Sequence, residues 1–580
     1  MSVRRLSFLA VAVVSIIFWA ACGQVYRPVV IPCSTGGVPG CPVETNPSPA
    51  NFHAVLGISN NAPGYSGEAM QLDVAGDSVI GETSFSTGSA PNAGLNPTHA
   101  AMLPSDSRVY VATAGSAFPG GTDSIESFSP VFQSTQGTGF GAVSTLGLPS
   151  QSTSIVAISE AANVVTVTLG TALSNVVAGS AIVIGNQAVT GYNGTFAIVA
   201  ITGTTLQYVD TVTGLAPSSG GTASVPPQPV FVNSTQNTAM YVANYNSNSV
   251  SAINTASNVV FNSALVGTNP VSLAETPNGL KLYVANQGSN TVSSLNPVDM
   301  TPNVVTGFTG VNPVWIVARG DSQKVYVLTE GDGQLVTIDV ATDTVTSSLP
   351  VGAGANFIFF DPNLNRLYIT NPVTGMVYVF SDTGPNDTPT QLAAISMTAG
   401  ANPPCQSACA PVSVTALLDG SRFYVASYQT STTCTPSSCI ILPLLTVFDA
   451  NSMTVKYPSA PSVQYPFAPS MTLLTWPPAL PNQYAVATQP YCATAPLYPA
   501  LYSPGVPRFR MFTAAAADSS RVYVSICDAG AIAIVNTTGA NTNNSGSPLP
   551  PDTLVIDALT LQEANSTTAL QPPIFLLMGQ

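Results

Sequence analysis

Short runs of alternating apolar and polar residues recur along the chain, and turn-forming residues separate them. The clearest set lies in residues 270–310, where PVSLAETP, KLYVANQ, TVSSLNP and VVTGFTG each have the length and alternation of a β-strand. Asn278-Gly279, between the first two runs, is a preferred pair for a tight hairpin turn. The segment therefore predicts a four-stranded antiparallel meander of roughly forty residues.

The same pattern returns at a nearly constant interval, with a tyrosine of the second strand as its marker. Four markers are spaced by 42, 43 and 42 residues: Tyr241, Tyr283, Tyr326 and Tyr368. Weaker copies surround three more: Tyr110, Tyr424 and Tyr523. A sheet of this size cannot bury both faces alone, whereas radially stacked sheets cover one another. The repeat predicts an all-β fold, a β-propeller of four-stranded antiparallel blades.

The number of blades depends on which repeats are counted. Seven marked repeats favour seven blades. The segment around Tyr484 copies the strand-turn-strand pattern and would form either an eighth blade or a decorated loop. An open ring would leave unpaired strand edges. We therefore expect an N-terminal strand within residues 69–85 to pair with strands after Arg508 and close the ring.

The second strands also carry a recognisable motif. YVAN occurs at residues 241–244 and again at 283–286. These residues resemble the YVTN-type β-propeller repeats, most clearly between residues 229 and 381. The resemblance implies an exported, surface-layer-like protein, and the wider lactonase-like propeller superfamily also includes enzymes. Shared blades imply a fold and not a reaction.

Residues 1–22 have the layout of a lipoprotein-type signal peptide. Arg4 and Arg5 precede the apolar run LSFLAVAVVSIIFWA, and small residues lead to Cys22. We expect export, lipidation of Cys22, and anchoring at a bacterial outer membrane or cell surface, with the periplasmic side as an alternative. An ordinary signal peptide with an incidental cysteine, or an uncleaved anchor, is the competing interpretation.

The remaining chain divides by composition and by the phase of the repeat. Residues 23–50 are rich in Pro and Gly and predict a tether. Residues 51–150 and 226–560 carry the propeller repeats, and 151–225 interrupt them with strands separated by Gly-rich turns, as expected of a small inserted β-domain. Residues 561–580 are expected to form a C-terminal tail.

The cysteine content is consistent with export. Besides Cys22 there are eight cysteines, an even number typical of disulfides in an oxidising compartment: Cys33, Cys41, Cys405, Cys409, Cys434, Cys439, Cys492 and Cys527. The short loop between Cys33 and Cys41 favours their pairing. The propeller topology brings Cys492 and Cys527 to the same end of neighbouring strands, which predicts a second disulfide.

The four cysteines between residues 405 and 439 leave more than one arrangement open. Cys405 and Cys409 precede an innermost strand, and Cys434 and Cys439 follow its neighbour, so all four lie at one end of a blade. Local pairing and crossed pairing are both compatible with this placement. The spacing also resembles a four-thiolate zinc site, but an oxidising compartment favours disulfides. No metal or cofactor is assigned.

Charge narrows the classes of partner. The 580 residues include 27 acidic and 13 basic residues, a net charge of −14, and only 7% are charged. An acidic surface argues against nucleic acid and anionic lipid as partners. After the N-terminus no apolar run approaches the roughly 18 residues that a spanning helix requires. We expect a monomer whose contact with a membrane is through a lipid anchor alone.

Candidate ligand-binding residues lie at the start of the predicted innermost strands. The second residue after the recurring proline faces the channel mouth or the wall between blades, and in four blades it is aromatic: His99, Phe231, Trp315 and, at the equivalent place, Phe357. Ser272 and Ser413 occupy this place in two others. Such a ring of aromatic residues could stack on a sugar, a peptide or an aromatic ligand. The alternative is packing between blades.

Catalytic signals are poor. The chain has two histidines, His53 and His99, and neither stands in a catalytic motif. Asp332, Asp339 and Asp343 occupy turns, where aspartate is first a turn-forming residue and only secondarily a calcium ligand. The sequence predicts a non-catalytic, exported scaffold that binds an envelope protein or carbohydrate through its loop-decorated face. The alternatives are a lactonase-like hydrolase with an active site at the channel mouth, and a purely structural envelope component.

Overall fold

The computed structural model describes sixteen ranges of the chain: 55–59, 67–73, 78–85, 94–117, 121–130, 142–384, 387–398, 405, 409–430, 441–456, 471–472, 510–527, 531–538, 551–554, 559–560 and 573–578. Strands dominate these ranges, which also contain two short 3-10 turns, η1 (Gly115–Ala117) and η2 (Thr190–Tyr192). None of the helical segments in the described ranges is long and apolar enough to cross a membrane.

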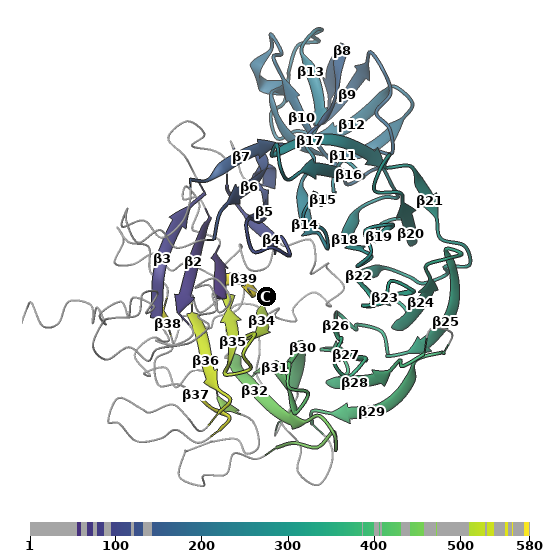
Figure 1. Ribbon diagram of the computed structural model, residues 1–580. Coiled ribbons are helices and arrows are strands. Elements are labelled where there is room, and N and C mark those ends of the chain that lie inside the picture. The colour runs from purple at the N-terminus through teal and green to yellow at the C-terminus, as the bar shows by residue number, and fades with distance from the viewer. Residues whose placement is uncertain are drawn as a thin grey trace, which may run out of the picture.

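Within the described residues, eight antiparallel sheets stand around a common axis and form a β-propeller (Figure 1). We call the region enclosed by the innermost strands the channel. We number the blades along the chain and give each from its innermost strand outwards. Blade 2 contains β4 (Pro97–Met102), β5 (Val109–Ala114), β6 (Asp123–Phe128) and β7 (Ser144–Gly147). Blade 3 contains β14 (Pro229–Asn233), β15 (Ala239–Asn244), β16 (Ser249–Asn254) and β17 (Val259–Leu265). Blade 4 contains β18 (Pro270–Glu275), β19 (Leu282–Asn286), β20 (Thr291–Leu295) and β21 (Pro302–Val304).

The remaining blades continue in the same order around the ring. Blade 5 contains β22 (Pro313–Ala318), β23 (Lys324–Thr329), β24 (Gln334–Asp339) and β25 (Thr344–Pro350). Blade 6 contains β26 (Phe357–Asp361), β27 (Arg366–Asn371), β28 (Met376–Ser381) and β29 (Thr390–Ser396). Blade 7 contains β30 (Cys409–Ala416), β31 (Arg422–Thr430), β32 (Ile441–Asp449) and β33 (Met471–Thr472). Blade 8 contains β34 (Met511–Ala515), β35 (Arg521–Ile526), β36 (Ala531–Asn536), β37 (Thr553–Leu554) and β38 (Leu559–Thr560).

Blade 1 joins the two ends of the chain and closes the ring. Its innermost strand is β39 (Pro573–Met578), followed by β1 (Val55–Ser59), β2 (Glu68–Asp73) and β3 (Ser78–Ser84). Antiparallel pairing of β39 with β1 satisfies backbone groups that an open ring would leave unpaired. Closure thus pairs an N-terminal strand with one after Arg508, as expected, but that strand is β1; the expected residues 69–85 supply β2 and β3, which lie further out in the same blade.

Closure also corrects two expectations. The ring has eight blades among the described residues, not the favoured seven, because the mixed blade 1 adds to the seven that carry a marker tyrosine. The segment around Tyr484, considered as a possible eighth blade, lies outside the described residues. Residues 561–580, expected to be a tail, supply β39, whose apolar residues Ile574 to Leu577 are buried.

Residues 151–225 form a closed six-stranded barrel between blades 2 and 3, seen above the ring in Figure 1. Its strands are β8 (Gln151–Ala161), β9 (Val164–Leu169), β10 (Ala181–Gly185), β11 (Gly194–Thr202), β12 (Thr205–Val209) and β13 (Thr222–Val225). Alternate residues point inwards, as in β9, where Val165, Val167 and Leu169 are buried. The barrel therefore has its own core, which includes Tyr192 and Tyr208.

The cores of the propeller lie between adjacent blades. The marker tyrosines of the second strands are at most 2% exposed. Successive residues of a second strand point alternately towards one neighbouring blade and the other, so both faces of the strand pack against another sheet. This explains why YVAN-type strands are apolar in consecutive positions and not alternating.

Candidate ligand-binding channel

Six aromatic side chains from the innermost strands form a closed cycle across the channel. Starting at His99, the distances between ring centroids are 3.8 Å to Phe231, 5.6 Å onward to Trp315, 4.9 Å to Phe357, 5.8 Å to Phe512, 4.3 Å to Phe575 and 4.3 Å back to His99. These separations lie within or just below the usual range for interacting aromatic pairs. All four predicted ligand-binding residues belong to this cycle.

A repeated bulge places most of these side chains. In blade 3 the pairing register shifts between Pro229 and Phe231, so that Val230 is the extra residue on the innermost strand. The same shift follows the first proline of β4, β18, β22 and β30. A bulge increases local twist and re-aims the next side chain. The recurring proline thus marks the strand start from which the third residue reaches the cycle.

Three blades contribute a polar residue at this position, and each performs the same task. His99 Nδ1 accepts the backbone N–H of Val232 at 3.5 Å, Ser272 Oγ accepts that of Ile316 at 3.3 Å, and Ser413 Oγ accepts that of Thr513 at 3.0 Å. In every case the donor is the residue that follows an aromatic member of the next blade. The polar position therefore fixes the backbone beneath the neighbouring ring.

The imidazole of His99 is consequently held in its uncharged form. Burial, with a further contribution from the charge of Arg510, lowers the pKa of His99 to about 3. Because Nδ1 accepts a hydrogen bond, the single proton resides on Nε2. His99 is only 6% exposed and lies between Phe231 and Phe575. A histidine so placed serves the packing of the channel, and it is not poised to exchange protons near neutral pH.

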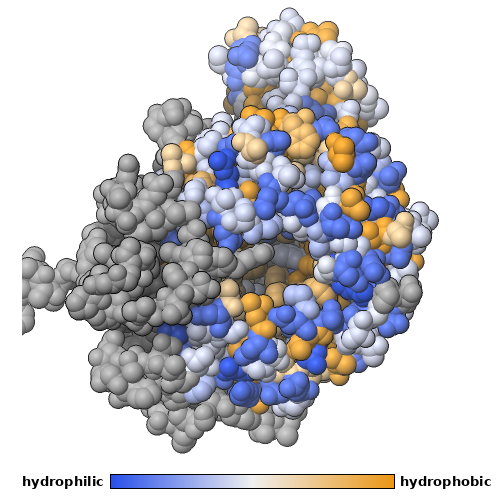
Figure 2. All heavy atoms as spheres, viewed as in Figure 1, coloured by the Kyte–Doolittle hydropathy of each residue, from blue (hydrophilic) through white to orange (hydrophobic). Residues whose placement is uncertain are grey.

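The cycle lies close to one end of the channel. His99, Phe231, Trp315 and Phe575 are each the third residue of their strands, so they stand about 7 Å from the strand starts at a rise of roughly 3.3 Å per residue. Trp315 and Phe512 are partly exposed, whereas the other four members are buried. Figure 2 shows the surface hollowed at the centre of the ring.

The channel end nearest the cycle is also where the barrel is attached. We call this end the decorated face; it carries the starts of the innermost strands and the turns between second and third strands. The turn of blade 3 holds the barrel, because Asn246 Nδ2 donates to the carbonyl of Ala181 at 3.0 Å and its Oδ1 accepts the N–H of Ala181 at 2.6 Å. Asn175 Nδ2 adds a contact to the carbonyl of Val266 at 3.1 Å.

Asparagine side chains connect the blades along the decorated face. The N–H of Asn269 donates to Asn248 Oδ1 at 2.7 Å, and the N–H of Asn312 donates to Asn290 Oδ1 at 2.7 Å. All four residues have φ between 52° and 60°, a left-handed conformation that asparagine tolerates better than most residues. Blades 3, 4 and 5 are thus joined at the decorated face by short, uncharged amide side chains.

The opposite face uses charge instead. Six basic residues stand two positions before a marker tyrosine: Arg108, Lys281, Lys324, Arg366, Arg422 and Arg521. In three blades the marker tyrosine donates at 2.5 Å to an aspartate of the next blade: Tyr283 to Asp343, Tyr326 to Asp382 and Tyr424 to Asp552. The same aspartate forms an ion pair with the basic residue. We call each such trio a clamp.

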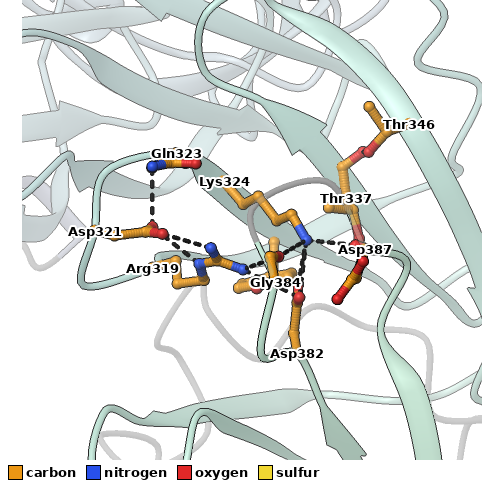
Figure 3. Close-up of polar contacts among 10 residues, drawn as sticks. Arg319, Asp321, Gln323, Lys324, Thr337, Thr346, Asp382, Gly384 and Asp387 are labelled. Carbon is orange, nitrogen blue, oxygen red and sulfur yellow. Dashed lines mark hydrogen bonds and ion pairs between the residues drawn. The ribbon is translucent and has the colours of Figure 1, made fainter.

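The clamp between blades 5 and 6 is the most buried. Asp382, 1% exposed, accepts contacts from Lys324 Nζ at 2.8 Å and from Arg319 Nη1 at 3.0 Å (Figure 3). Both cations also donate to the carbonyl of Gly384. Burial and the hydrogen bond to Asp382 raise the pKa of Tyr326 well above its ordinary value, so its phenol remains a donor. A carboxylate with three such partners joins two blades strongly.

Sequence reasoning missed two members of the cycle. Phe575 follows Pro573 with the same spacing as the other members, and this signal was present in the range expected to be a tail. Phe512 has no proline two positions before it, and β34 has no register shift at this point, so the motif could not identify it. Among the other candidates, His53 lies outside the described residues.

The disulfide expectations are resolved in part. Cys405 and Cys409 form a disulfide with a Cα–Cα distance of 6.0 Å, which selects local pairing for these two residues. Cys527 is also disulfide-bonded. Its pairing with Cys492 stays a prediction, because Cys492 lies outside the described residues, as do Cys22, Cys33, Cys41, Cys434 and Cys439.

Neither potential metal ligands nor sequence relatives extend this description of the channel. Where the structure is described, no three His, Cys, Asp or Glu side chains gather as metal ligands. Neither the models of protein families nor the curated protein sequences match the chain.

Solved structures with a similar arrangement include two of different activity. The periplasmic gluconolactonase of Pseudomonas aeruginosa is 11% identical, with 90% of this chain and 98% of that chain covered and a TM-score of 0.44. A chain of the hydrazine synthase of Kuenenia stuttgartiensis is 14% identical, with 55% and 81% covered and a TM-score of 0.37. At these identities and TM-scores the similarities say nothing about activity or substrate.

Proposed function

We propose that this protein is a non-catalytic binding protein of the cell envelope, which holds a carbohydrate or protein ligand at its decorated face. The observation that carries the proposal is the aromatic cycle near that face, with Trp315 and Phe512 partly exposed. Binding sites combine an apolar, aromatic lining with a few placed polar groups. The cycle and the surrounding amides provide both.

The state of His99 supports binding over hydrolysis. Its Nδ1 accepts a backbone N–H, and its lowered pKa keeps it neutral. A general base would need a pKa closer to the working pH and a free nitrogen facing a nucleophile. His99 instead has the role that Ser272 and Ser413 have in other blades.

The proposed location follows from the sequence. Export through the signal peptide and lipidation of Cys22 would place the propeller at the outer membrane or cell surface, with the tether of residues 23–50 between anchor and ring. Eight blades and a docked barrel form a rigid support for the loops of the decorated face. A monomer without nucleic acid or cofactor suffices for this role.

A binding screen of the purified full chain tests the proposal. The immobilised protein is exposed to a glycan array and to envelope proteins, next to Trp315→Ala and a control, Phe261→Ala, whose ring lies on the outer strand β17 and is 47% exposed. We expect binding that Trp315→Ala weakens at least tenfold and Phe261→Ala leaves unchanged. Turnover of a lactone panel that depends on channel residues would instead support the lactonase-like alternative.

A further inference from the structure

We infer that the ligand is an uncharged carbohydrate, held on the aromatic cycle by the amide of Asn356. This inference rests on the proposed function and narrows its ligand to one class. Three observations carry it: the distribution of charge between the two faces, the amide of Asn356, whose Nδ2 has no partner among the described residues, and the exposed part of Trp315.

Charge is nearly absent from the decorated face of blades 3 to 6. The turns and strand entries at 245–248, 266–269, 287–290, 306–312, 330–333, 351–356 and 372–375 contain no Lys, Arg or His, and their acidic residues are Glu330 and Asp332. Asp332 Oδ1 accepts the N–H of Val311 at 3.2 Å, and Glu330 Oε2 accepts Asn312 Nδ2 at 3.4 Å. An anionic ligand would find no cation in these segments, and the two acids would repel it. Arg510, at the start of blade 8, is the cation near His99, but it is 5% exposed and donates to the carbonyl of Thr98.

Several amide atoms on this face have unused hydrogen-bonding capacity. Among the described residues, four buried amide atoms of blades 3, 4 and 6 lack a partner: Asn244 Oδ1, Asn286 Oδ1, Gln287 Nε2 and Asn356 Nδ2. Two are acceptors and two are donors. Asn244, Asn286 and Gln287 are buried, and we assign them no ligand contact, whereas Asn356 is partly exposed. A sugar hydroxyl both donates and accepts, so it can pair with the amide of Asn356.

The position of Asn356 joins the amides to the cycle. Asn356 directly precedes Phe357, and Thr370 Oγ1 holds its Oδ1 at 2.9 Å, which fixes the orientation of the amide. Trp315 lies 4.9 Å from Phe357 between ring centroids. A pyranose ring has an apolar face and hydroxyl edges. Stacking on Trp315 would bury the face while a hydroxyl reaches the amide of Asn356.

The test compares soluble polysaccharides of different charge with the full chain. Tryptophan fluorescence and calorimetry measure binding of neutral dextran and glucomannan, acidic alginate and cationic chitosan at 50 and 500 mM NaCl. We expect at least one neutral polysaccharide to bind at least tenfold more tightly than alginate and chitosan. Its affinity should change less than twofold with salt, because no ion pair forms.

Variants connect the binding to the site. Asn356→Leu removes the amide at similar volume, and we expect it to weaken neutral-glycan binding about tenfold while thermal unfolding stays cooperative. Trp315→Phe keeps an aromatic ring and should weaken binding less than Trp315→Ala. Phe261→Ala is the matched surface control and should bind as the parent does.

The outcomes separate this inference from the proposed function. Tighter binding of alginate or chitosan, or binding of an envelope protein with no glycan bound, overturns the inference and leaves the binding role intact. Neutral-glycan binding that survives both Trp315→Ala and Asn356→Leu also overturns it, because the site would then lie elsewhere. Binding of no ligand by a folded protein overturns both.

Discussion

The two faces of the ring solve the problem of joining blades in different ways. On the decorated face, asparagines such as Asn248 and Asn290 bridge to the next blade through neutral hydrogen bonds. On the opposite face, clamps such as Lys324, Tyr326 and Asp382 join blades with buried charge. The difference shows that charged contacts between blades can be concentrated on one face, which leaves the other face with few charges and available for recognition.

Two turns of the opposite face share the same backbone geometry, although only one of them carries an acid at its fifth position. The turn Asp339 to Asp343 in blade 5 and the turn 449–453 in blade 7 share the same backbone contacts: the fifth residue donates its N–H to the first at 3.0 Å and has positive φ. In blade 5 the fifth residue is Asp343, the partner of Tyr283. In blade 7 it is Met453, and the hydroxyl of the corresponding Tyr368 has no partner.

The largest expected effect comes from removing the acid of the most buried clamp. Asp382→Ala leaves Lys324 buried without its carboxylate and leaves Arg319 with Asp321 alone, which should destabilise the protein by about 3–5 kcal/mol. Chemical denaturation would measure the loss. Asp387→Ala is the control: its side chain is exposed, and Lys324 contacts its backbone carbonyl, so stability should change by less than about 0.5 kcal/mol. Equal effects of the two variants would refute the importance of the clamp.

Lowering the pH should destabilise the folded protein through protonation of His99, near the decorated face. Its pKa is about 3 in the folded protein and near 6.5 when unfolded, so its contribution is fully present above pH 6.5 and falls as pH decreases towards 3. The maximum slope is about 1.4 kcal/mol per pH unit. His99→Ser keeps an acceptor, as in blades 4 and 7, and removes this titration. We expect a lower stability at pH 7 but a shallower decline between pH 6.5 and 4; parallel curves would contradict the assignment.

Exchanging the residue at the fifth turn position tests the comparison within the opposite face. Asp343→Met should cost about 1–2 kcal/mol, because it leaves the buried Tyr283 hydroxyl only its long contact with the Val340 carbonyl at 3.5 Å and removes the partly exposed pair with Lys281. Urea unfolding with Asp339→Asn as a reference for the same turn would measure it. No loss of stability would show that this clamp contributes nothing.

The reverse exchange at the same turn position of blade 7, Met453→Asp, should have the smallest effect on stability. Met453→Asp would offer Tyr368 and Arg366 the partner that Tyr283 and Lys281 have, and aspartate suits the positive φ of 57° better than methionine. We expect a gain of about 0.5–1 kcal/mol in urea unfolding. The gain should disappear in a Tyr368→Phe background, since the hydroxyl is then absent. A gain that persists there would point to the backbone alone.

Much of the fold could be predicted from the sequence, because the tyrosine spacing reports a repeated unit. Four members of the aromatic cycle were also predicted, since the proline before His99, Phe231 and Trp315 marks the strand start. The blade count was not, because closure pairs β39 with β1 across the whole chain, and a short apolar C-terminal segment gives no local signal of its partner.

The three residues of each clamp could not be matched to one another from the sequence, for a similar reason. The basic residue and the tyrosine stand two positions apart and repeat visibly, but their acid comes from a turn of the next blade. Asp343, Asp382 and Asp552 lie at different offsets from their own marker tyrosines. A periodic search therefore finds two of the three residues and misses the one that joins the blades.

We assign stabilising contacts between blades to the clamps of the opposite face and ligand binding to the decorated face. The most direct test measures ligand affinity and thermal midpoint together for Asp343→Met and Asn356→Leu. We predict that Asp343→Met lowers the midpoint and leaves the affinity for a neutral polysaccharide unchanged. Asn356→Leu should weaken that affinity about tenfold and shift the midpoint less than Asp343→Met does. A loss of affinity in Asp343→Met as large as in Asn356→Leu, in a folded protein, would contradict the account, because recognition would then depend on both faces.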